Sequence, residues 1–246
     1  MIDKNEILNI VRQQLAENLD CSVNDFINEG IFFVANDIRK KPFLEITTMG
    51  KGIVISASSE ILLSVQNLLA GKSREEIFEF PFIYGQSIYY IPDLKVLEEI
   101  PLLAEYEFEL LEGKDIQKLQ GIQGFENSLV FDKNGYTHTV SVLCAIKDGE
   151  IIGLASASVV YEKMWEVGID VKPQYRKDGL ATLLVSNLSM HILNKGIIPF
   201  YCAASSNIGS QAVAHRSGFI PCWVSTYRNI LDGSSSFNNI IGNLKL

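Results

Sequence analysis

The stretch V-K-P-Q-Y-R-K-D-G-L-A-T, residues 171–182, decides how the chain is expected to fold. It follows a strand-like run from Met164 to Val171 and precedes a run, from about Gly179 to Asn194, in which apolar residues recur at helical intervals. Asn194-Lys195-Gly196 is typical of a helix end, because glycine tolerates the left-handed backbone found there. A strand, a glycine loop and a helix are therefore predicted in this order.

The start of the predicted helix is suited to an anion. Gly179 and Ala181 are small, so a ligand could approach the backbone closely. The first N–H groups of a helix lack intrahelical acceptors and, together with the helix dipole, favour a pyrophosphate. Arg176 and Lys177 can add positive charge. The spacing R-x-x-G-x-A also occurs in ordinary loops, so the surrounding sequence has to distinguish an anion site from simple loop geometry.

The elements around this loop come in an informative order. Val140–Ile146 and Ile151–Val160 flank Asp148-Gly149, which tolerates the positive φ angles of a tight turn, so a β-hairpin is predicted before the strand. After the helix, the segment N-I-G-S-Q-A-V-A-H-R-S-G-F, residues 207–219, places Asn207 ahead of a short helix that Gly218-Phe219 closes.

These features together resemble the GNAT superfamily of N-acetyltransferases, in which a strand ends in V-x-P-x-x-R-x-x-G-x-A and the next loop cradles coenzyme A. The resemblance covers roughly residues 127–228. It implies an α/β fold (α+β, mixed sheet) with a GNAT-like acyltransferase arrangement in the C-terminal half, acting as an acetyl-CoA-dependent N-acetyltransferase. The run E-V-G-I-D-V-K-P-Q-Y-R-K-D-G-L-A-T, with P-F-Y-C before the second segment, also resembles the zwittermicin A resistance type. That likeness implies a small-molecule amine as acceptor, such as an aminopolyol antibiotic.

The resemblance also implies where the coenzyme binds. It would contact the main chain of the strand end and of the glycine loop, and a backbone N–H near the strand end would hold the oxyanion. The expected coenzyme-binding residues are Ile169, Val171, Arg176, Lys177, Asp178, Gly179, Leu180, Ala181, Thr182, Asn207 and Ser210.

Two carboxylates are candidate catalytic residues, because a primary amine with a pKa of about 10 has to lose a proton before it attacks. Glu166 and Asp170 lie on the strand that would deliver the coenzyme and, with Gly168, share one face if side chains alternate strictly. A bulge would change that parity. The alternative interpretation is an edge charge and a turn-supporting carboxylate, and Glu162 is a weaker third candidate.

One position departs from the superfamily pattern. Many members place a tyrosine, which protonates the departing thiolate, where this chain has Ala214. A thiolate with a pKa of about 8.5 leaves without much help, so the change lowers the expected rate without excluding transfer. Tyr201, Ser206, Ser210 and His215 are candidates for a substitute.

The chain is expected to form two lobes, residues 1–125 as a smaller α/β lobe of unassigned role and residues 126–246 as the acetyl-CoA-binding domain. The remaining predicted elements are a helix over 5–19, strands over 31–35, 43–48 and 53–57, a helix capped by Ser58 or Ser59 and ended by Gly71, a short helix after Ser73, strands near 87–91 and 105–111, a short helix over 114–121, and a turn between two final strands over 232–243.

Composition narrows the classes of partner. A net charge of −8 and a pI near 5.0 argue against nucleic acid and favour a cationic acceptor. No metal-ligand spacing, basic leader or long apolar span is present in the sequence. We therefore expect a cytoplasmic protein with buried thiols, without metal or membrane contact, and homodimerisation is left open.

Two other functions remain open at this level. The chain could be a non-catalytic acyl-CoA-binding module whose N-terminal lobe contacts a partner, because Ala214 replaces the usual acid and no single base stands out. It could also be a phosphate-binding structural domain without coenzyme, which would leave residues 207–219 unexplained.

Overall fold

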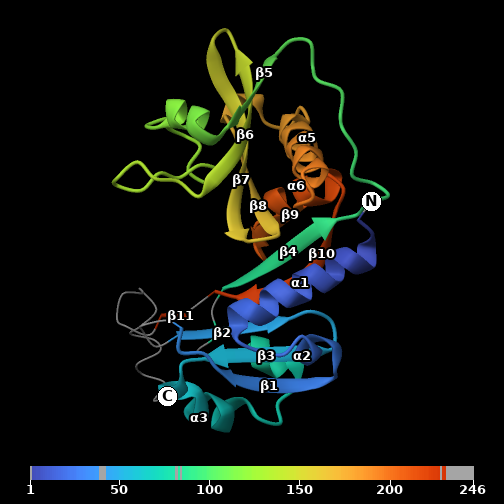
Figure 1. The fold of residues 1–246 in the computed structure, drawn as a ribbon, viewed down its shortest axis with the longest axis vertical. Helices are drawn as coiled ribbons and strands as arrows, with labels where there is room; N and C mark the ends of the chain where they lie inside the picture. The colour runs from blue at the N-terminus through green and yellow to red at the C-terminus, as the bar shows by residue number, and fades with distance from the viewer. Residues whose placement is uncertain (1, 39–42, 81–82, 84, 228, 231–246) are drawn as a thin grey trace. The chain divides into compact units, whose positions relative to one another are not determined.

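The computed structural model describes residues 2–38, 43–80, 83, 85–227 and 229–230, which form two compact units. The first unit contains residues 2–8, 90–203 and 207–221, and the second contains the described parts of 9–89, 204–206 and 222–246. Two strands, β4 (Gln86–Pro92) and β10 (Phe219–Thr226), contribute residues to both units. Figure 1 shows the elements of each unit in sequence colours.

The sheet of the first unit contains β5 (Glu107–Glu112), β6 (Thr139–Lys147), β7 (Glu150–Tyr161), β8 (Met164–Val171) and β9 (Ile198–Ala204). The first four pair antiparallel in chain order, and β9 runs parallel to β8. Asp148 and Gly149, with φ angles of 52° and 78°, make the turn between β6 and β7. The predicted hairpin and the strand after it are therefore confirmed.

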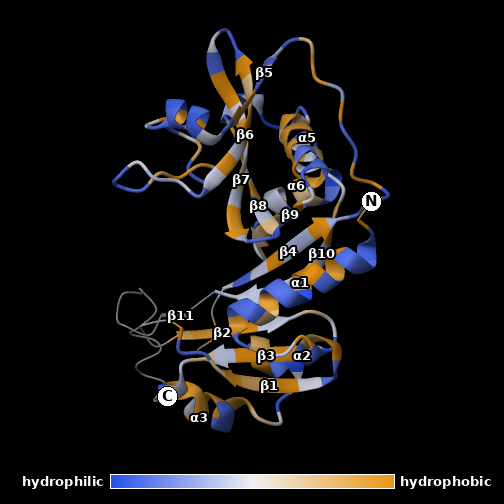
Figure 2. Ribbon diagram, in the orientation of Figure 1, coloured by the Kyte–Doolittle hydropathy of each residue, from blue (hydrophilic) through white to orange (hydrophobic). Residues whose placement is uncertain are grey.

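The two faces of this sheet are covered differently. A Cβ built on Gly153 of β7 would lie 3.0 Å from Leu184 of α5 (Leu180–Asn194), so the helix packs directly on that face. On the opposite face, a Cβ on Gly168 of β8 would lie 2.9 Å from the Cα of Ser128. The 3₁₀-helix η1 (Gly113–Leu119) packs on this second face with Phe125 and other apolar side chains. Figure 2 shows the apolar character of α5 and of the central strands.

The described part of the second unit combines a small sheet with helices. Strand β1 (Gly30–Ala35) runs parallel to β3 (Gly52–Ala57), and β3 pairs antiparallel with β2 (Phe43–Thr48). On one face of β2 and β3 an apolar core includes Leu44, Ile46 and Ile55. The other elements are α1 (Lys4–Leu19), which begins in the first unit, α2 (Asn24–Ile27), α3 (Ser59–Leu69), α4 (Arg74–Phe78) and β11 (Asn229–Ile230).

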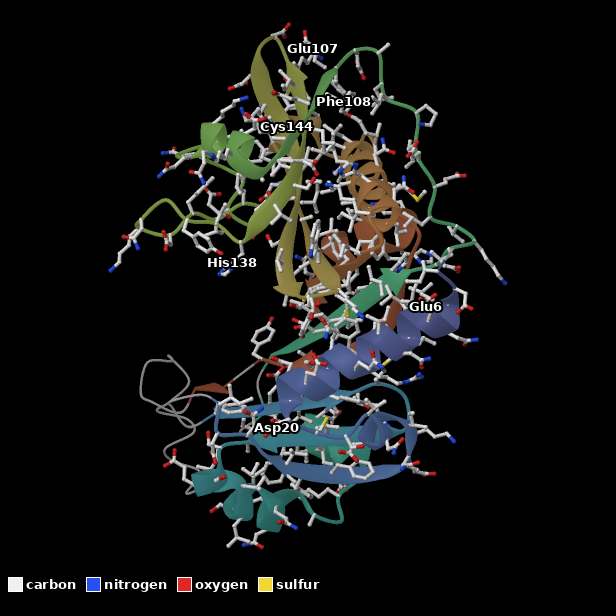
Figure 3. The ribbon with its side chains drawn as sticks, viewed as in Figure 1. Glu6, Asp20, Glu107, Phe108, His138 and Cys144 are labelled. Carbon is white, nitrogen blue, oxygen red and sulfur yellow. The ribbon has the colours of Figure 1, made fainter. Side chains whose placement is uncertain are left out.

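Most predicted elements appear where the sequence places them, and three points differ or fall outside the described residues. The predicted helix over 114–121 is a 3₁₀-helix, η1. Of the four cysteines only Cys144, in the middle of β6 (Figure 3), is fully buried; the other three are partly exposed. The turn predicted over 232–243 lies outside the described residues. No helix within the described ranges has the length and apolar character needed to cross a membrane.

Gly218, before β10, carries a steric constraint that a substitution can test. Its φ angle is +81°, its carbonyl accepts a hydrogen bond from the Asp93 N–H at 2.8 Å, and an added Cβ would lie 2.7 Å from the backbone of Leu97. We expect Gly218→Ala to lower the free energy of unfolding by about 2–4 kcal/mol, through left-handed strain and overpacking together. Urea denaturation measures it.

The control is Gly196→Ala, since Gly196 has a φ angle of +77° but nothing within 4 Å of its Cβ position. It should cost only the strain, about 1–2 kcal/mol. Equal losses in the two variants would contradict the packing argument.

Candidate active site

The glycine loop folds back on the end of β8. After Val171 the chain makes the short 3₁₀-helix η2 (Pro173–Tyr175), and the Arg176 Nε donates to the Val171 carbonyl at 2.8 Å. Lys177 and Gly179 then both take positive φ angles, 79° and 83°. These two left-handed residues turn the chain directly into α5.

The loop leaves the first turn of α5 open to a ligand. Gly179 is the N-cap residue and has no side chain to satisfy the first N–H groups, those of Leu180, Ala181 and Thr182. Nothing lies within 4 Å of a Cβ position on Gly179, so an anion could reach these donors. Leu180 is buried at 1% exposure and anchors the helix, so only its main chain is available.

An aromatic cluster supports the loop from the side of the hairpin. Lys147, at the end of β6, places its Nζ 5.4 Å from the ring centroid of Tyr106 and 5.7 Å from that of Tyr175. The two tyrosine rings meet edge to face, with centroids 6.4 Å apart. Tyr175 of η2 is thereby held against β6 and the chain entering β5.

Strands β8 and β9 pair over only half of their length. Their register runs from Met164↔Ile198 to Val167↔Tyr201, and the described residues 168–171 of β8 do not pair with β9. On its other edge β8 remains paired with β7 as far as Val171. The strands therefore separate beyond Val167, and alternate residues of β8, Ile169 and Val171, direct main-chain groups toward β9 without a partner on that strand.

Glu166 and Asp170 share one face of β8, as strict alternation predicts. The β7–β8 register is regular from Trp165 to Val171, with its one irregularity on the β7 side, so no bulge changes the parity within β8. This face is the one that carries Gly168 and Ser128 and lies opposite to α5.

Asp170 is held by a network of hydrogen bonds. Its Oδ2 accepts from the N–H of Asn127, the N–H of Ser128 and the Ser128 Oγ at 2.9–3.0 Å, and its Oδ1 accepts from the Asn127 Nδ2 at 2.8 Å. The side chain is buried, with 7% exposure. The carboxylate thus fixes the segment before β6 onto β8. This supporting role matches the interpretation given above as the alternative to catalysis.

Glu166 is in a different environment. It is half-buried and directly precedes Val167, the last residue of β8 that pairs with β9. Burial raises the pKa of its carboxyl above the ordinary value. A carboxyl with a raised pKa is a better proton acceptor than an ordinary glutamate once it is ionised. Of the two candidates, Glu166 therefore has the properties that a general base needs.

A pair of hydroxyl groups lies on the β9 side of the gap. The Tyr201 Oη is 2.8 Å from the Ser210 Oγ, and Ser210 stands in the first turn of α6 (Ile208–Arg216). Asn207 caps this helix, because its Oδ1 accepts from the Ser210 N–H at 3.1 Å. Of the other suggested substitutes for the missing acid, Ser206 and His215 are exposed.

Two histidines have partners elsewhere in the first unit. His138, labelled in Figure 3, has its Nδ1 3.3 Å from the Tyr136 Oη. The His191 Nε2 is 2.9 Å from the Glu112 Oε1, which also accepts from Lys195. The Lys195 hydrogen bond, with that of His191, lowers the pKa of Glu112 to about 2. No three His, Cys, Asp or Glu side chains in the described parts of the chain are grouped to hold a metal ion.

A family model described as GNAT acetyltransferase matches residues 101–225, just over half of the chain. The chain belongs to the GNAT acetyltransferase family. The search of curated proteins found no match.

Several solved structures resemble the chain at low identity. A GCN5-related N-acetyltransferase-like protein from Streptococcus suis 89/1591 is 14% identical with a TM-score of 0.48, over 91% of this chain and 99% of that one. A GCN5-related N-acetyltransferase from Kribbella flavida is 13% identical with a TM-score of 0.43, over 58% of this chain, and the chain spans only 56% of its length. An aminoglycoside acetyltransferase from an uncultured soil metagenomic sample, in complex with sisomicin, is 18% identical with a TM-score of 0.37, over 46% and 87% of the two chains.

The GNAT family match does not begin at the predicted boundary between the two domains, residues 125 and 126. The match begins at residue 101, so it includes β5 and η1 as well as the hairpin, β8, the glycine loop and α5. The mixed α/β fold with a GNAT domain is therefore established, whereas the division into residues 1–125 and 126–246 stays a prediction.

Sequence reasoning missed Asn127 and Ser128 as partners of this GNAT domain's central strand. From the sequence, the run G-F-E-N-S-L, residues 124–129, is interpreted as a segment that joins the two predicted lobes. Its one signal is a run of three polar residues, Glu126, Asn127 and Ser128, between Phe125 and Leu129, both of which are buried. Polar residues between buried apolar ones indicate a segment whose polar groups need partners within the fold.

The Asp170 network generates a prediction about stability. Asp170→Asn replaces an acceptor oxygen by a donor that faces other donors, so we expect a loss of about 2–4 kcal/mol in the free energy of unfolding. Asp148→Asn is the control, because this exposed turn residue has a φ angle of 52°, which asparagine tolerates. Urea denaturation of both variants measures the difference. Unchanged stability of Asp170→Asn would show that the network does not hold the segment.

Proposed function

We infer that the protein transfers an acetyl group from acetyl-CoA to an amine of a small molecule by direct attack of the amine on the thioester. One observation carries this proposal: β8 has a free main-chain edge beyond Val167, and that edge leads into the open N-terminus of α5. Family membership supports the use of acetyl-CoA.

The arrangement fits the two ends of the coenzyme. A pyrophosphate would accept from the first N–H groups of α5, where Gly179 leaves space and Lys177 and Arg176 are exposed. The pantetheine arm carries amide groups, which can pair with the main-chain groups that Ile169 and Val171 direct away from β7, except the Val171 carbonyl that Arg176 already binds, as an added strand would. Running back along this edge, the arm would bring the thioester toward the point where β8 and β9 separate, at Val167 and Tyr201.

The reaction then needs two functions from the protein. Glu166 would accept a proton from the amine as nitrogen attacks the carbonyl carbon. A free backbone N–H of Ile169–Val171 would donate to the oxyanion that forms on the thioester oxygen. The C–N bond forms, the C–S bond breaks, and the coenzyme leaves as a thiolate that solvent protonates.

Two features of the sequence support the choice of acceptor. The net charge of −8 favours a cationic molecule, which suits an amine that arrives as an ammonium ion. The resemblance of residues 166–182 to the zwittermicin A resistance type supports an aminopolyol. Release of thiol in a library of small amines tests this directly, and it separates a transferase from a protein that only binds acyl-CoA.

The loop assignment predicts the effect of a branched side chain at the start of α5. We expect Gly179→Val to weaken acetyl-CoA binding at least tenfold, about 1.4 kcal/mol, because the side chain would occupy the approach of the pyrophosphate. Isothermal titration calorimetry measures the affinity.

The matched control is Gly196→Val at the other end of the same helix, where the φ angle is also positive, +77°, and nothing lies within 4 Å of a Cβ position. It imposes similar backbone strain away from the proposed site. The assignment is wrong if a folded Gly179→Val protein binds acetyl-CoA as tightly as the Gly196→Val control.

The base assignment predicts a pH effect. Because the pKa of Glu166 is raised by burial, wild-type activity should fall on acidification at a higher pH than an ordinary glutamate would give. Glu166→Gln should lower turnover by about 10²–10⁴ at neutral pH, with acetyl-CoA affinity nearly unchanged, and should recover as rising pH supplies free amine.

Glu162→Gln, in the exposed turn before β8, serves as the control and should keep wild-type turnover. Steady-state rates from pH 5 to 10 measure both variants. Wild-type turnover by Glu166→Gln at neutral pH would reject Glu166 as the base.

A further inference from the structure

We propose that Ser210, held in place by Tyr201, donates a hydrogen bond to the sulfur of the departing thiolate. The inference rests on the proposed function and adds a group that acts on the leaving atom. Ser210 is then a catalytic residue and Tyr201 a positioning residue.

The hydroxyl pair stands where the thioester is expected. Tyr201 is the last residue of β9 that pairs with β8, so its position marks the point at which the two strands separate. Partnered residues on neighbouring strands project to the same face, so Tyr201 lies on the face of Val167 and opposite to Glu166. The base and the hydroxyl pair would therefore approach the thioester from opposite faces of the sheet.

The pair is built to present one donor. Tyr201 is buried, with 2% exposure, and its Oη lies 2.8 Å from the Ser210 Oγ, whereas Ser210 is only half-buried. Burial raises the pKa of Tyr201, and the hydrogen bond with Ser210 opposes that rise, so the phenol keeps its proton at neutral pH. Either hydroxyl can be the donor in this pair, and in the proposed arrangement the buried Tyr201 donates, which leaves the half-buried Ser210 hydroxyl free to turn its own proton outward.

The position of the Ser210 backbone does not depend on its hydroxyl. The Asn207 Oδ1 accepts from the Ser210 main-chain N–H, so removal of the side-chain oxygen leaves the cap of α6 intact. The Tyr201 ring also packs against Phe219, with centroids 6.2 Å apart, and Tyr201→Phe would preserve that contact. Both hydroxyls can thus be removed with little change to the fold.

The chemistry requires no additional reactant. As the C–S bond breaks, its electron pair moves to sulfur, and the Ser210 O–H stabilises the developing negative charge. The amine's proton passes to Glu166 and then to solvent, and the free thiolate takes a proton from solvent. A hydrogen bond to a charged group commonly changes a rate by about tenfold to a hundredfold.

The test compares leaving groups. Ser210→Ala should lower turnover with acetyl-CoA by about tenfold to a hundredfold, with the dissociation constant for acetyl-CoA nearly unchanged. With the selenoester analogue the loss should shrink to less than about threefold, because a selenolate is a weaker base and needs less stabilisation. Ser210→Thr, which keeps the hydroxyl, should recover most of the rate.

Two further variants separate this role from a structural one. Tyr201→Phe should lower turnover less than Ser210→Ala, and the double variant should be no slower than Ser210→Ala alone, since Tyr201 acts only through Ser210. Ser206→Ala, an exposed hydroxyl in the turn before α6, should keep wild-type turnover.

Each outcome bears on the proposal. Wild-type turnover by Ser210→Ala, or an equal loss with thioester and selenoester, would overturn the role of Ser210 and leave the acetyl transfer intact. Absence of thiol release by the wild-type protein, with every amine tried, would overturn the proposed function and this inference together.

Discussion

The free edge of β8 is the constraint on which the proposed site depends. A strand inside a sheet normally satisfies its main-chain groups on both sides, and buried groups without partners are costly. Beyond Val167 the described part of β8 keeps its partner β7 but separates from β9, so this edge is stable only if water or a ligand pairs with it. A ligand with its own amide groups, anchored by a phosphate at the start of α5, meets that requirement.

The two faces of β8 divide the remaining tasks. On one face Asp170 binds Asn127 and Ser128 and keeps the strand rigid at the end where the coenzyme would lie. Glu166, on the same face, is half-buried and carries a pKa raised by burial, which suits proton transfer. The opposite face packs on α5, and the Tyr201–Ser210 pair joins β9 to α6 there. Structural and chemical functions are thus assigned to neighbouring residues with different partners.

Local signals explain what could be predicted from sequence. The hairpin turn at Asp148-Gly149, the strand ending at Val171 and the helix after Gly179 each follow from residues within a few positions of one another. Strict alternation along β8 was enough to place Glu166 and Asp170 on one face. The family resemblance supplied the expectation of acetyl-CoA, and the family match supports it.

The features that could not be predicted depend on contacts between distant residues. Asp170 and Ser128 are 42 positions apart, so nothing near Asp170 in the sequence indicates that its carboxylate already has four hydrogen bonds. The point at which β8 and β9 separate likewise depends on how two strands pair that are not adjacent in the sequence, because α5 lies between them along the chain. Ser210 could be suggested as a donor, but its pairing with Tyr201 required the fold.

Amide hydrogen exchange with and without acetyl-CoA tests the central claim most directly, because it reads the main-chain groups themselves. Coenzyme seated on the free edge should slow exchange at the amides of Ile169, Val171 and residues 180–182, and should leave the already paired amides of β6 nearly unchanged. Saturating acetyl-CoA that protects neither of the two predicted segments would contradict the account.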